Sequence, residues 1–338
     1  MVQEVSLLQL ARALTIRRVA NAAQIASSFV LSALTRKNVV WGVPPVLTVE
    51  PTNLCNLRCP LCVTGNGSMI RPKGRMDLAT YQRLIDELGA RILYVILYQQ
   101  GEPYINHHFL DFVAYAKARR LYVTTSTNAH YFDRETCERT VASGIDAMII
   151  SVDGATQETY AKYRVGGKLA QVLEGIRNLV AAKRSARRKT PYLFLQFLVM
   201  RHNEHEISRM EELARELGVD HFLRKNVQVE TLAEAREWLP SQDSYRRYTL
   251  TETEFVVKAG KGACPRPWLT TMVNWDGTVS PCCFDKNGQH RVGDLRQEHS
   301  FVDLWNADRY HQFRQELLTH RDGIDICKNC NQGLRVFV

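Results

Sequence analysis

Strand-like runs of apolar residues alternate with amphipathic segments over most of the chain. The apolar runs are rich in β-branched and aromatic residues and cover 45–52, 92–98, 121–127, 147–153, 193–200 and 220–225. Apolar residues recur at helical spacing between them, for example over 78–90, 109–119, 172–184 and 206–218. Near-continuous apolar strands are typical of a parallel sheet covered by helices. The pattern predicts an α/β fold, either an open doubly wound sheet or a complete or partial barrel.

A helical segment precedes the first predicted strand. Residues 10–37 contain no Gly or Pro and are rich in helix-forming residues, so we expect one helix there. Its longest uncharged run, Val19 to Thr35, includes Asn21, Gln24, Ser27 and Ser28 and is shorter than the ~20 apolar residues that span a bilayer. We interpret residues 1–44 as a helical extension packed on the main domain. Peripheral contact of this basic helix with a membrane surface is the alternative.

Polar residues follow four consecutive predicted strands. These four loops contain, in chain order, Cys55, Cys59 and Cys62; Gln99 to Pro103; Ser126 to Ala129; and Ser151 to Gly154. In parallel α/β folds the functional groups collect at the carboxyl ends of the strands. The sequence therefore predicts that these loops form one functional site.

The first of these loops has a C-x3-C-x2-C spacing. A structural zinc site normally closes with four protein ligands, whereas three ligands leave a position for a reacting group. Soft thiolate ligands favour zinc, copper(I) or an iron–sulfur cluster. On a four-iron cluster, three thiolates would leave one iron open to a substrate or cofactor. A zinc site remains the alternative at this point.

A second group of cysteines follows a polar connector, residues 227–263. Within residues 274–282, apolar and polar residues alternate on both sides of Asp276-Gly277. This pattern around a turn-forming pair predicts a β-hairpin. Four thiolates from this region would form a closed site, for which a zinc ribbon is the alternative. These four are Cys264, Cys282 and the C-x2-C pair Cys327 and Cys330. The two other cysteines have simpler interpretations: Cys137 as a core residue and Cys283 as a packed neighbour of a ligand.

The stretch EPTNLCNLRCPLC, residues 50–62, resembles the radical S-adenosylmethionine (SAM) superfamily. The resemblance implies a partial (β/α)6 TIM-like barrel over residues 45–226. The C-terminal cysteines are similar to the SPASM/Twitch extension of this superfamily, which implies a linker at 227–263 and a small β-hairpin and helix domain at 264–338. Because Cys330 is the last cysteine, the shorter Twitch form with one auxiliary cluster is expected.

The resemblance also implies roles for individual residues. Cys55, Cys59 and Cys62 would hold a [4Fe–4S] cluster whose open iron binds SAM, and Cys264, Cys282, Cys327 and Cys330 would hold an auxiliary [4Fe–4S] cluster. Gly101 and Glu102 would receive the methionine amino group, in a loop where Gln100 replaces the commoner second glycine. Ser126, Asn128, Ser151 and Asp153 would face the ribose or carboxylate of SAM. Arg164 would pair with the carboxylate, for which a guanidinium is well suited. No catalytic residue for the substrate is implied.

The implied activity is that of a radical SAM oxidoreductase. Reductive cleavage of SAM would give a 5′-deoxyadenosyl radical that abstracts a hydrogen atom from an unactivated carbon. Net two-electron oxidation, with the auxiliary cluster as electron acceptor, is the leading reaction. The alternatives are a redox-neutral epimerase in which a thiol such as Cys283 returns a hydrogen atom, a peptide-modifying maturase, and oxidation of a bulky tetrapyrrole or lipid-like substrate. A non-enzymatic zinc-binding protein is the alternative outside enzymes.

Composition and charge narrow the expected surroundings and partners. The 338 residues carry a formal charge of +9, which suits an acidic electron donor such as flavodoxin or ferredoxin. Basic residues are spread along the chain without interleaved aromatics, so nucleic acid is not an expected partner. Nine cysteines without a secretory signal predict a reducing, cytoplasmic location. A small molecule or a peptide is the expected substrate class.

Overall fold

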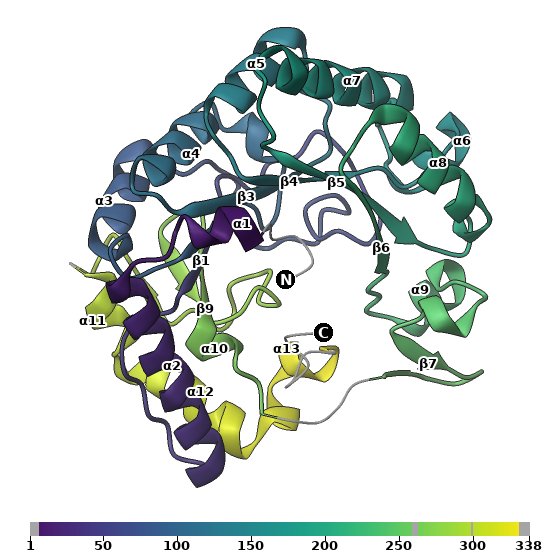
Figure 1. Cartoon of the computed structure of the whole chain (residues 1–338). Coiled ribbons are helices and arrows are strands. Elements are labelled where there is room, and N and C mark those ends of the chain that lie inside the picture. The colour runs from purple at the N-terminus through teal and green to yellow at the C-terminus, as the bar shows by residue number, and fades with distance from the viewer. Residues whose placement is uncertain (1–6, 259–262, 299, 331–338) are drawn as a thin grey trace. The chain divides into compact units, whose positions relative to one another are not determined.

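The computed structural model describes residues 7–258, 263–298 and 300–330 of the chain. These residues form two compact units, and each of them contains parallel strands with helices packed beside them (Figure 1). Unit 1 comprises the described residues of the ranges 1–54, 69–124 and 260–338, and unit 2 comprises those of 55–68 and 125–259. The α/β class predicted from the sequence is therefore confirmed.

Unit 1 is built on strands that pair in parallel. β1 (Val46–Val49) pairs with β2 (Tyr94–Ile96), and β2 pairs with β3 (Tyr122–Thr127), whose last three residues belong to unit 2. Helices α3 (Leu78–Leu88) and α4 (Phe109–Ala118) make the two crossovers and lie on the outer side of these strands (Figure 1). Strand residues such as Leu47, Val95 and Val123 are fully buried, as near-continuous apolar strands of a helix-covered sheet require.

The N-terminal segment forms two helices, so the prediction of a single helix over residues 10–37 is wrong. Helix α1 (Leu7–Ala11) ends before a turn, and α2 (Ile16–Thr35) begins after Thr15. The Thr15 side chain accepts the Arg18 N–H, and its backbone is extended, so Thr15 is the N-cap of a new helix. Within the described part of the chain, no helix is both long enough and apolar enough to cross a membrane.

The C-terminal region adds strands to the same sheet. β9 (Thr270–Val273) pairs in parallel with β1, and β10 (Thr278–Ser280) pairs antiparallel with both β9 and β11 (Gly293–Asp294). The predicted hairpin at Asp276-Gly277 is therefore present. Gly277 has a φ of +84°, a conformation in which glycine is favoured because it has no Cβ.

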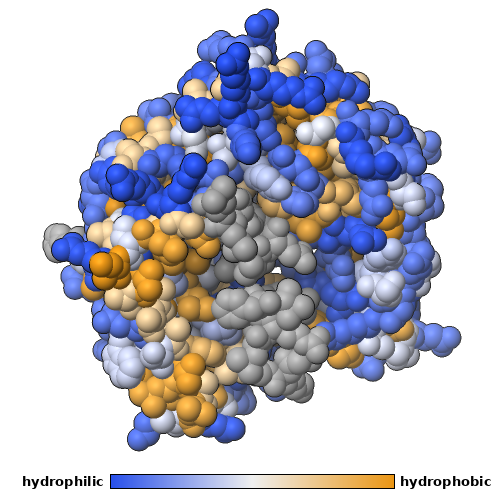
Figure 2. Space-filling model, in the orientation of Figure 1, coloured by the Kyte–Doolittle hydropathy of each residue, from blue (hydrophilic) through white to orange (hydrophobic). Residues whose placement is uncertain are grey.

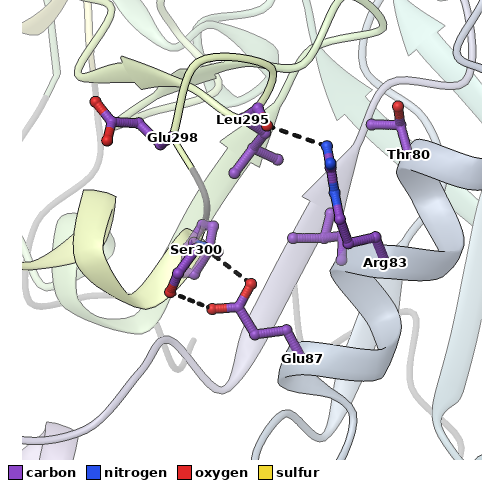
Figure 3. A pocket seen from close by; sticks show the side chains of 8 residues that line it. Thr80, Arg83, Glu87, Leu295, Glu298 and Ser300 are labelled. Atoms are coloured by element: carbon purple, nitrogen blue, oxygen red, sulfur yellow. Dashed lines mark hydrogen bonds between the residues drawn. The ribbon is translucent and has the colours of Figure 1, made fainter.

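Short helices complete unit 1 around this hairpin. They are α10 (Arg266–Leu269), α11 (Phe301–Trp305), α12 (Asp308–Thr319) and α13 (Asp325–Lys328). Figure 3 shows how α3 contacts the start of α11: Glu87 accepts the Ser300 hydroxyl at 2.7 Å, and Arg83 donates to the Leu295 carbonyl at 3.0 Å. Glu87 also accepts the Phe301 and Val302 N–H groups, so its carboxylate satisfies free donors at the start of α11.

Unit 2 continues the alternation of strands and helices. β4 (Ala147–Ser151), β5 (Tyr192–Val199) and β6 (His221–Asn226) pair in parallel in that order. The helices of this part are α5 (Arg134–Ala142), α6 (Gln157–Tyr163), α7 (Leu169–Ser185) and α8 (Ile207–Leu217). All six predicted strands are present along the chain, with ends that differ by up to three residues from the sequence pattern.

The polar connector forms short helices and a hairpin in unit 2. Helix α9 (Leu232–Trp238) begins with a capping box formed by Thr231 and Glu234. A separate antiparallel hairpin, β7 (Tyr248–Leu250) with β8 (Phe255–Val257), follows it. Single-turn 3-10 helices occur at Pro103–Ile105, Glu204–Glu206, Asp243–Tyr245 and Arg321–Gly323. Trp238 and Tyr248 are buried in one cluster with Leu57 and Cys59, so this connector packs against the cysteine loop.

Candidate functional site

The loop that carries the first three cysteines belongs to unit 2 and is tightly folded on itself. The Cys62 N–H donates to the Cys59 carbonyl at 3.1 Å, and the Leu57 N–H donates to the Cys55 sulfur at 3.4 Å. Gly65 lies against this turn, because a Cβ at Gly65 would be 2.5 Å from the Cys59 nitrogen. The sequence analysis missed Gly65. Its position three residues after Cys62 was the available signal.

Asn128, at the end of β3, contacts this loop within unit 2. Its amide donates to the Asn56 side chain at 2.8 Å and approaches the Cys55 sulfur at 3.9 Å. Its side-chain oxygen, Oδ1, accepts the backbone N–H of His130 at 3.1 Å. Asn128 therefore orients the start of the cysteine loop. Asn56 was not singled out from the sequence, although it lies between two of the cysteines.

Arg164, Asp153 and Cys59 come together in unit 2, which the sequence alone did not predict. The Arg164 Nε donates to the Asp153 Oδ2 at 2.5 Å, and its Nη1 lies 3.8 Å from the Cys59 sulfur. Asp153 is fully buried, and its Oδ1 accepts the Leu198 N–H at 2.7 Å. Burial alone would lower the pKa of Arg164, but the charges of Asp153 and Cys59 raise it well above its usual value. The guanidinium is thus a permanent positive charge beside the cysteine loop.

The pKa of the Cys59 thiol depends on its burial and on the nearby Arg164. Burial raises the pKa of Cys59 above its usual value, and the positive charge of Arg164 acts in the opposite direction. Ligation by a metal cluster requires the thiolate form. Arg164 therefore favours the form of Cys59 that could bind iron.

The two serines of the predicted site lie at strand ends. Ser151 is the last residue of β4 and is buried, and its hydroxyl accepts the Gln196 amide at 3.5 Å. Ser126 is the penultimate residue of β3 and is half-buried. Both belong to unit 2, as do Asn128 and Asp153.

Gly101 and Glu102 belong to unit 1 and pack against the end of the β1 segment. Gly101 has a φ of +74°, and a Cβ there would be 2.6 Å from the carbonyl oxygens of Thr52 and Leu54. The Glu102 N–H donates to the Leu54 carbonyl at 2.7 Å, and its buried side chain accepts the Tyr104 N–H. Glycine is required at position 101 because the loop approaches this backbone closely.

A buried ion pair, which the sequence analysis missed, also fixes the end of the β1 segment in unit 1. Arg71 binds Glu50 in a bidentate manner, with distances of 2.7 and 2.9 Å. Glu50 accepts the Trp275 N–H from the C-terminal hairpin, and Arg71 donates to the Lys286 carbonyl. Glu50 precedes the first cysteine by five residues, and its position in an apolar-to-polar transition was the available signal.

Three of the four C-terminal cysteines influence one another in unit 1. Burial raises the pKa of Cys264, with a further increase from Cys330. Burial raises the pKa of Cys327 to about 12, and the nearby Cys264 and Cys330 add to this shift. Like charges that disfavour each other's ionised forms indicate thiols that lie close together. The C-x2-C pair and Cys264 are thus brought together by the fold.

Cys282 and Cys283 follow β10 and differ in their surroundings. The Phe284 N–H donates to the Cys282 sulfur at 3.5 Å, whereas the Arg266 Nη1 donates to the Cys283 sulfur at 3.3 Å. A hydrogen bond from Cys282 and the charge of Arg266 lower the pKa of Cys283 to about 5 despite its burial. The Gln99 side-chain amide donates a hydrogen bond to the Cys283 carbonyl at 2.5 Å.

The cysteine environments fit iron–sulfur ligation. The described residues, which include all nine cysteines, form no disulfide, and N–H donors point at the sulfurs of Cys55, Cys59 and Cys282. Such donors stabilise thiolates that carry cluster charge. Over the described ranges, no three His, Cys, Asp or Glu side chains approach one another closely enough to hold a single metal ion. These features define an α/β protein with cysteine loops suited to iron–sulfur clusters.

Comparison with known protein families agrees with this class. Residues 49–222, just over half of the chain, match the radical SAM superfamily, and residues 264–331 match the SPASM family, an iron–sulfur cluster-binding domain. The protein belongs to the radical SAM superfamily and carries a SPASM domain. The resemblance noted from the sequence is confirmed, and membership implies that the protein uses SAM and iron–sulfur clusters.

Curated relatives and solved structures extend this comparison. The chain is 25% identical over 293 residues to mycofactocin maturase MftC of Mycobacterium ulcerans, covering 80% of this chain and 77% of that protein. It is 28% identical over 296 residues to the PqqA peptide cyclase of Gluconobacter oxydans, covering 80% and 79%. The structure of SuiB from Streptococcus suis bound to S-adenosylmethionine aligns with a TM-score of 0.63 at 15% identity, covering 90% of this chain and 75% of that one. The last likeness concerns the fold.

Proposed function

We propose that the protein is a radical SAM oxidoreductase with two [4Fe–4S] clusters. Cys55, Cys59 and Cys62 would hold the SAM-binding cluster. The observation that carries this assignment is the set of donors aimed at this loop, from Leu57, Asn128 and Arg164. Cys264, Cys282, Cys327 and Cys330 would hold the auxiliary cluster, with Cys283 outside the ligand set.

Separate residues would bind the parts of SAM. Glu102 would receive the amino group, in a loop that Gly101 allows to approach the β1 segment. Ser126, Asn128 and Ser151 would face the ribose or carboxylate, and Arg164 would bind the carboxylate. A guanidinium has five N–H donors, so the pair with Asp153 leaves capacity for a second carboxylate. Both oxygens of Asp153 accept bonds within unit 2, which supports a role in positioning Arg164.

The proposed reaction is a net two-electron oxidation of the substrate. When bound, the reduced cluster and SAM supply a 5′-deoxyadenosyl radical, which takes one hydrogen atom from the substrate and becomes 5′-deoxyadenosine. A cluster held by Cys264, Cys282, Cys327 and Cys330 would supply an acceptor for the second electron, and the substrate would lose two protons and two electrons in total. Arg266 adds a positive charge near Cys264, Cys282 and Cys330, which favours the reduced state of a cluster held there.

Peptide modification is the second candidate function. It is favoured by the match to a maturase and to a peptide cyclase over 80% of the chain. The two candidates overlap, because oxidative modification of a peptide is also a net two-electron reaction. They differ in the substrate class and not in the residues that would bind SAM.

We further propose that the protein receives electrons from flavodoxin or ferredoxin in the cytoplasm. The formal charge of +9 supports an encounter with an acidic electron carrier. The odd number of cysteines, nine, fits a reducing compartment better than an oxidised disulfide framework.

Metal analysis of reconstituted variants tests the cluster assignment. Wild-type protein should contain about eight irons per chain and release 5′-deoxyadenosine when given SAM and dithionite. The triple variant Cys55→Ala/Cys59→Ala/Cys62→Ala should lose about four irons and all cleavage of SAM. Cys137→Ala is the matched control, because Cys137 is buried and is distant in sequence from both groups of cysteines. Retained cleavage in the triple variant would refute the assignment.

A second comparison tests the auxiliary site. Cys282→Ala should lose about four irons, whereas Cys283→Ala should retain all of them. The opposite result would show that Cys283 is the ligand. To identify the reaction, cell extract incubated with the enzyme and SAM is searched by mass spectrometry. A product lighter by two hydrogens supports oxidation, and a product of unchanged mass supports an epimerase.

A further inference from the structure

Helix α2 has an unusual distribution of polar and apolar residues. Its buried face carries Arg18, Asn21, Ser28 and Ser32 beside Ile25 and Phe29. Its solvent-exposed side carries an apolar stripe at helical spacing, bordered by the exposed polar residues Arg17, Gln24 and Ser27. The stripe consists of Ile16, Val19, Ala23, Ala26, Val30 and Leu34. An ordinary surface helix has the reverse arrangement. We call these six residues the α2 outer face.

Hydrogen bonds from Arg18 fix the orientation of the helix on unit 1. The guanidinium donates to the carbonyls of Ala13 (2.7 Å), Gly89 (2.7 and 3.2 Å), Arg119 (2.6 Å) and Arg120 (3.0 Å). Gly89 and Arg119 are the C-caps of α3 and α4, where carbonyl groups lack helical partners. A cation at two helix C-termini is also favourable for the helix dipoles.

Two more side chains hold the same face of α2 against unit 1. Asn21 donates to the Val43 carbonyl at 2.8 Å and accepts the Val43 N–H at 2.9 Å. The Ser32 hydroxyl donates to the Val39 carbonyl and accepts the Val39 N–H. Rotating the helix to bury its apolar face would leave all of these polar groups without their partners, at a substantial cost. The outward position of the apolar residues is therefore built into the fold.

The α2 outer face exposes large apolar side chains. Ile16 is 89% exposed, Leu34 79% and Val30 54%. Figure 2 shows hydrophobic residues gathered over the part of the surface that α2 occupies in Figure 1. Contiguous exposed apolar surface of this kind marks an interaction site more often than scattered apolar residues do.

The charged residues of the segment that contains α2 are all basic. Residues 5–49 contain no Asp or Glu. Arg12 lies in the turn before α2, Arg17 in its first turn, and Arg36 and Lys37 directly after its end, all exposed. Basic residues that border an apolar helix face are typical of helices that lie in the surface of an anionic bilayer.

We propose that the α2 outer face docks the protein on an anionic lipid surface, with the helix parallel to the membrane plane. A second copy of the chain fits this face less well. Parallel or antiparallel pairing of two α2 helices would bring their basic ends together, and no acidic residue between positions 5 and 49 could pair with them. Anionic lipid headgroups supply the missing negative charge, and the acyl region accepts the apolar side chains.

Vesicle flotation with the full chain tests this proposal. We expect binding to vesicles of phosphatidylcholine with phosphatidylglycerol, and weaker binding to phosphatidylcholine alone. Val30→Gln/Leu34→Gln should lower the partition coefficient at least about 10-fold, because two apolar contacts are lost. Arg17→Gln/Lys37→Gln should lower it about 10-fold on anionic vesicles only, with the remaining binding less sensitive to salt.

Val256→Gln is the matched control, because Val256 is 54% exposed in β8 of unit 2. It should bind anionic vesicles like the wild-type protein. The proposal is overturned if the wild-type protein fails to bind anionic vesicles, or if Val30→Gln/Leu34→Gln binds as well as the wild type. It is also overturned if sedimentation without lipid shows a dimer that Val30→Gln/Leu34→Gln dissociates, since the face would then belong to a second copy. Unchanged circular dichroism of each variant excludes misfolding as the cause.

Discussion

The pairing of Arg164 with Asp153 predicts a large and specific effect of substitution. Arg164→Met would leave the Asp153 carboxylate fully buried without its guanidinium partner, while the Leu198 N–H still donates to Oδ1. Breaking a buried pair by removing one partner costs about 3–5 kcal/mol. The Arg164 side chain is 15% exposed, so some water can reach the gap, and we expect a loss of about 3 kcal/mol in the free energy of unfolding.

A double variant separates the pair from other effects of Arg164. Arg164→Met/Asp153→Asn removes both charges and keeps an oxygen for the Leu198 N–H, so we expect a loss of only about 1 kcal/mol. The exposed pair of Arg209 and Glu216 is the matched control, and Arg209→Met should cost less than about 1 kcal/mol.

Urea unfolding of the cluster-free, reduced chain, followed by far-UV circular dichroism, measures these differences at constant slope. Two results would refute the reasoning. One is a loss below about 1 kcal/mol for Arg164→Met, which would mean that Asp153 finds other partners. The other is a double variant as unstable as the single one, which would assign the cost to packing of Arg164 rather than to its charge.

Three further predictions concern stability and are measured by the same unfolding experiment. Arg18→Ala should lower the free energy of unfolding by about 3 kcal/mol, because five charged hydrogen bonds are lost. Substitution of the exposed Arg17 with Ala should change it by less than about 0.5 kcal/mol. Equal effects would contradict the assigned role of Arg18. Gly101→Ala should lower the free energy of unfolding by at least about 2 kcal/mol more than Gly67→Ala does. Both glycines have positive φ, but only at Gly101 would the added Cβ lie 2.6 Å from carbonyl oxygens. Similar losses for the two variants would show that the Gly101 loop can move. Burial lowers the pKa of His202 to about 4. Below about pH 6.5 the unfolded chain therefore binds a proton at this side chain, whereas the folded chain does not. The free energy of unfolding should fall as the pH drops from about 6.5 to 4. His202→Gln should show a shallower fall over this window, and an unchanged slope would contradict the burial of His202.

The sequence by itself determined the alternation of strands and helices and the groups of cysteines. Apolar runs and helical spacing are local properties, and strands buried on both faces have few alternatives to a helix-covered parallel sheet. The hairpin at Asp276-Gly277 was also predictable, because its turn needs a residue with positive φ. The resemblance to radical SAM proteins rested on short spacings within one loop, which folding does not change.

Contacts between distant segments were decided only by the tertiary structure. Asp153 and Arg164 both appeared as binding residues in the sequence, but the fold shows that the two bind each other. The positions of Gly65 and Glu50 near the cysteines are visible in the sequence, but their contacts with Cys59 and with Arg71 are not. The pairing of β9 with β1 joins segments more than 200 residues apart, which no periodicity records.

The N-terminal segment illustrates the division most clearly. Helix propensity predicted a helix, and the capping role of Thr15, which divides the segment in two, depended on a single hydrogen bond to the Arg18 N–H. Propensity says nothing about which face of a helix is buried. The buried face of α2 is fixed by carbonyl groups at the ends of α3 and α4, which accept hydrogen bonds from Arg18. The apolar face was left outside because hydrogen bonding of buried polar groups is specific to partners and geometry, whereas apolar burial is not.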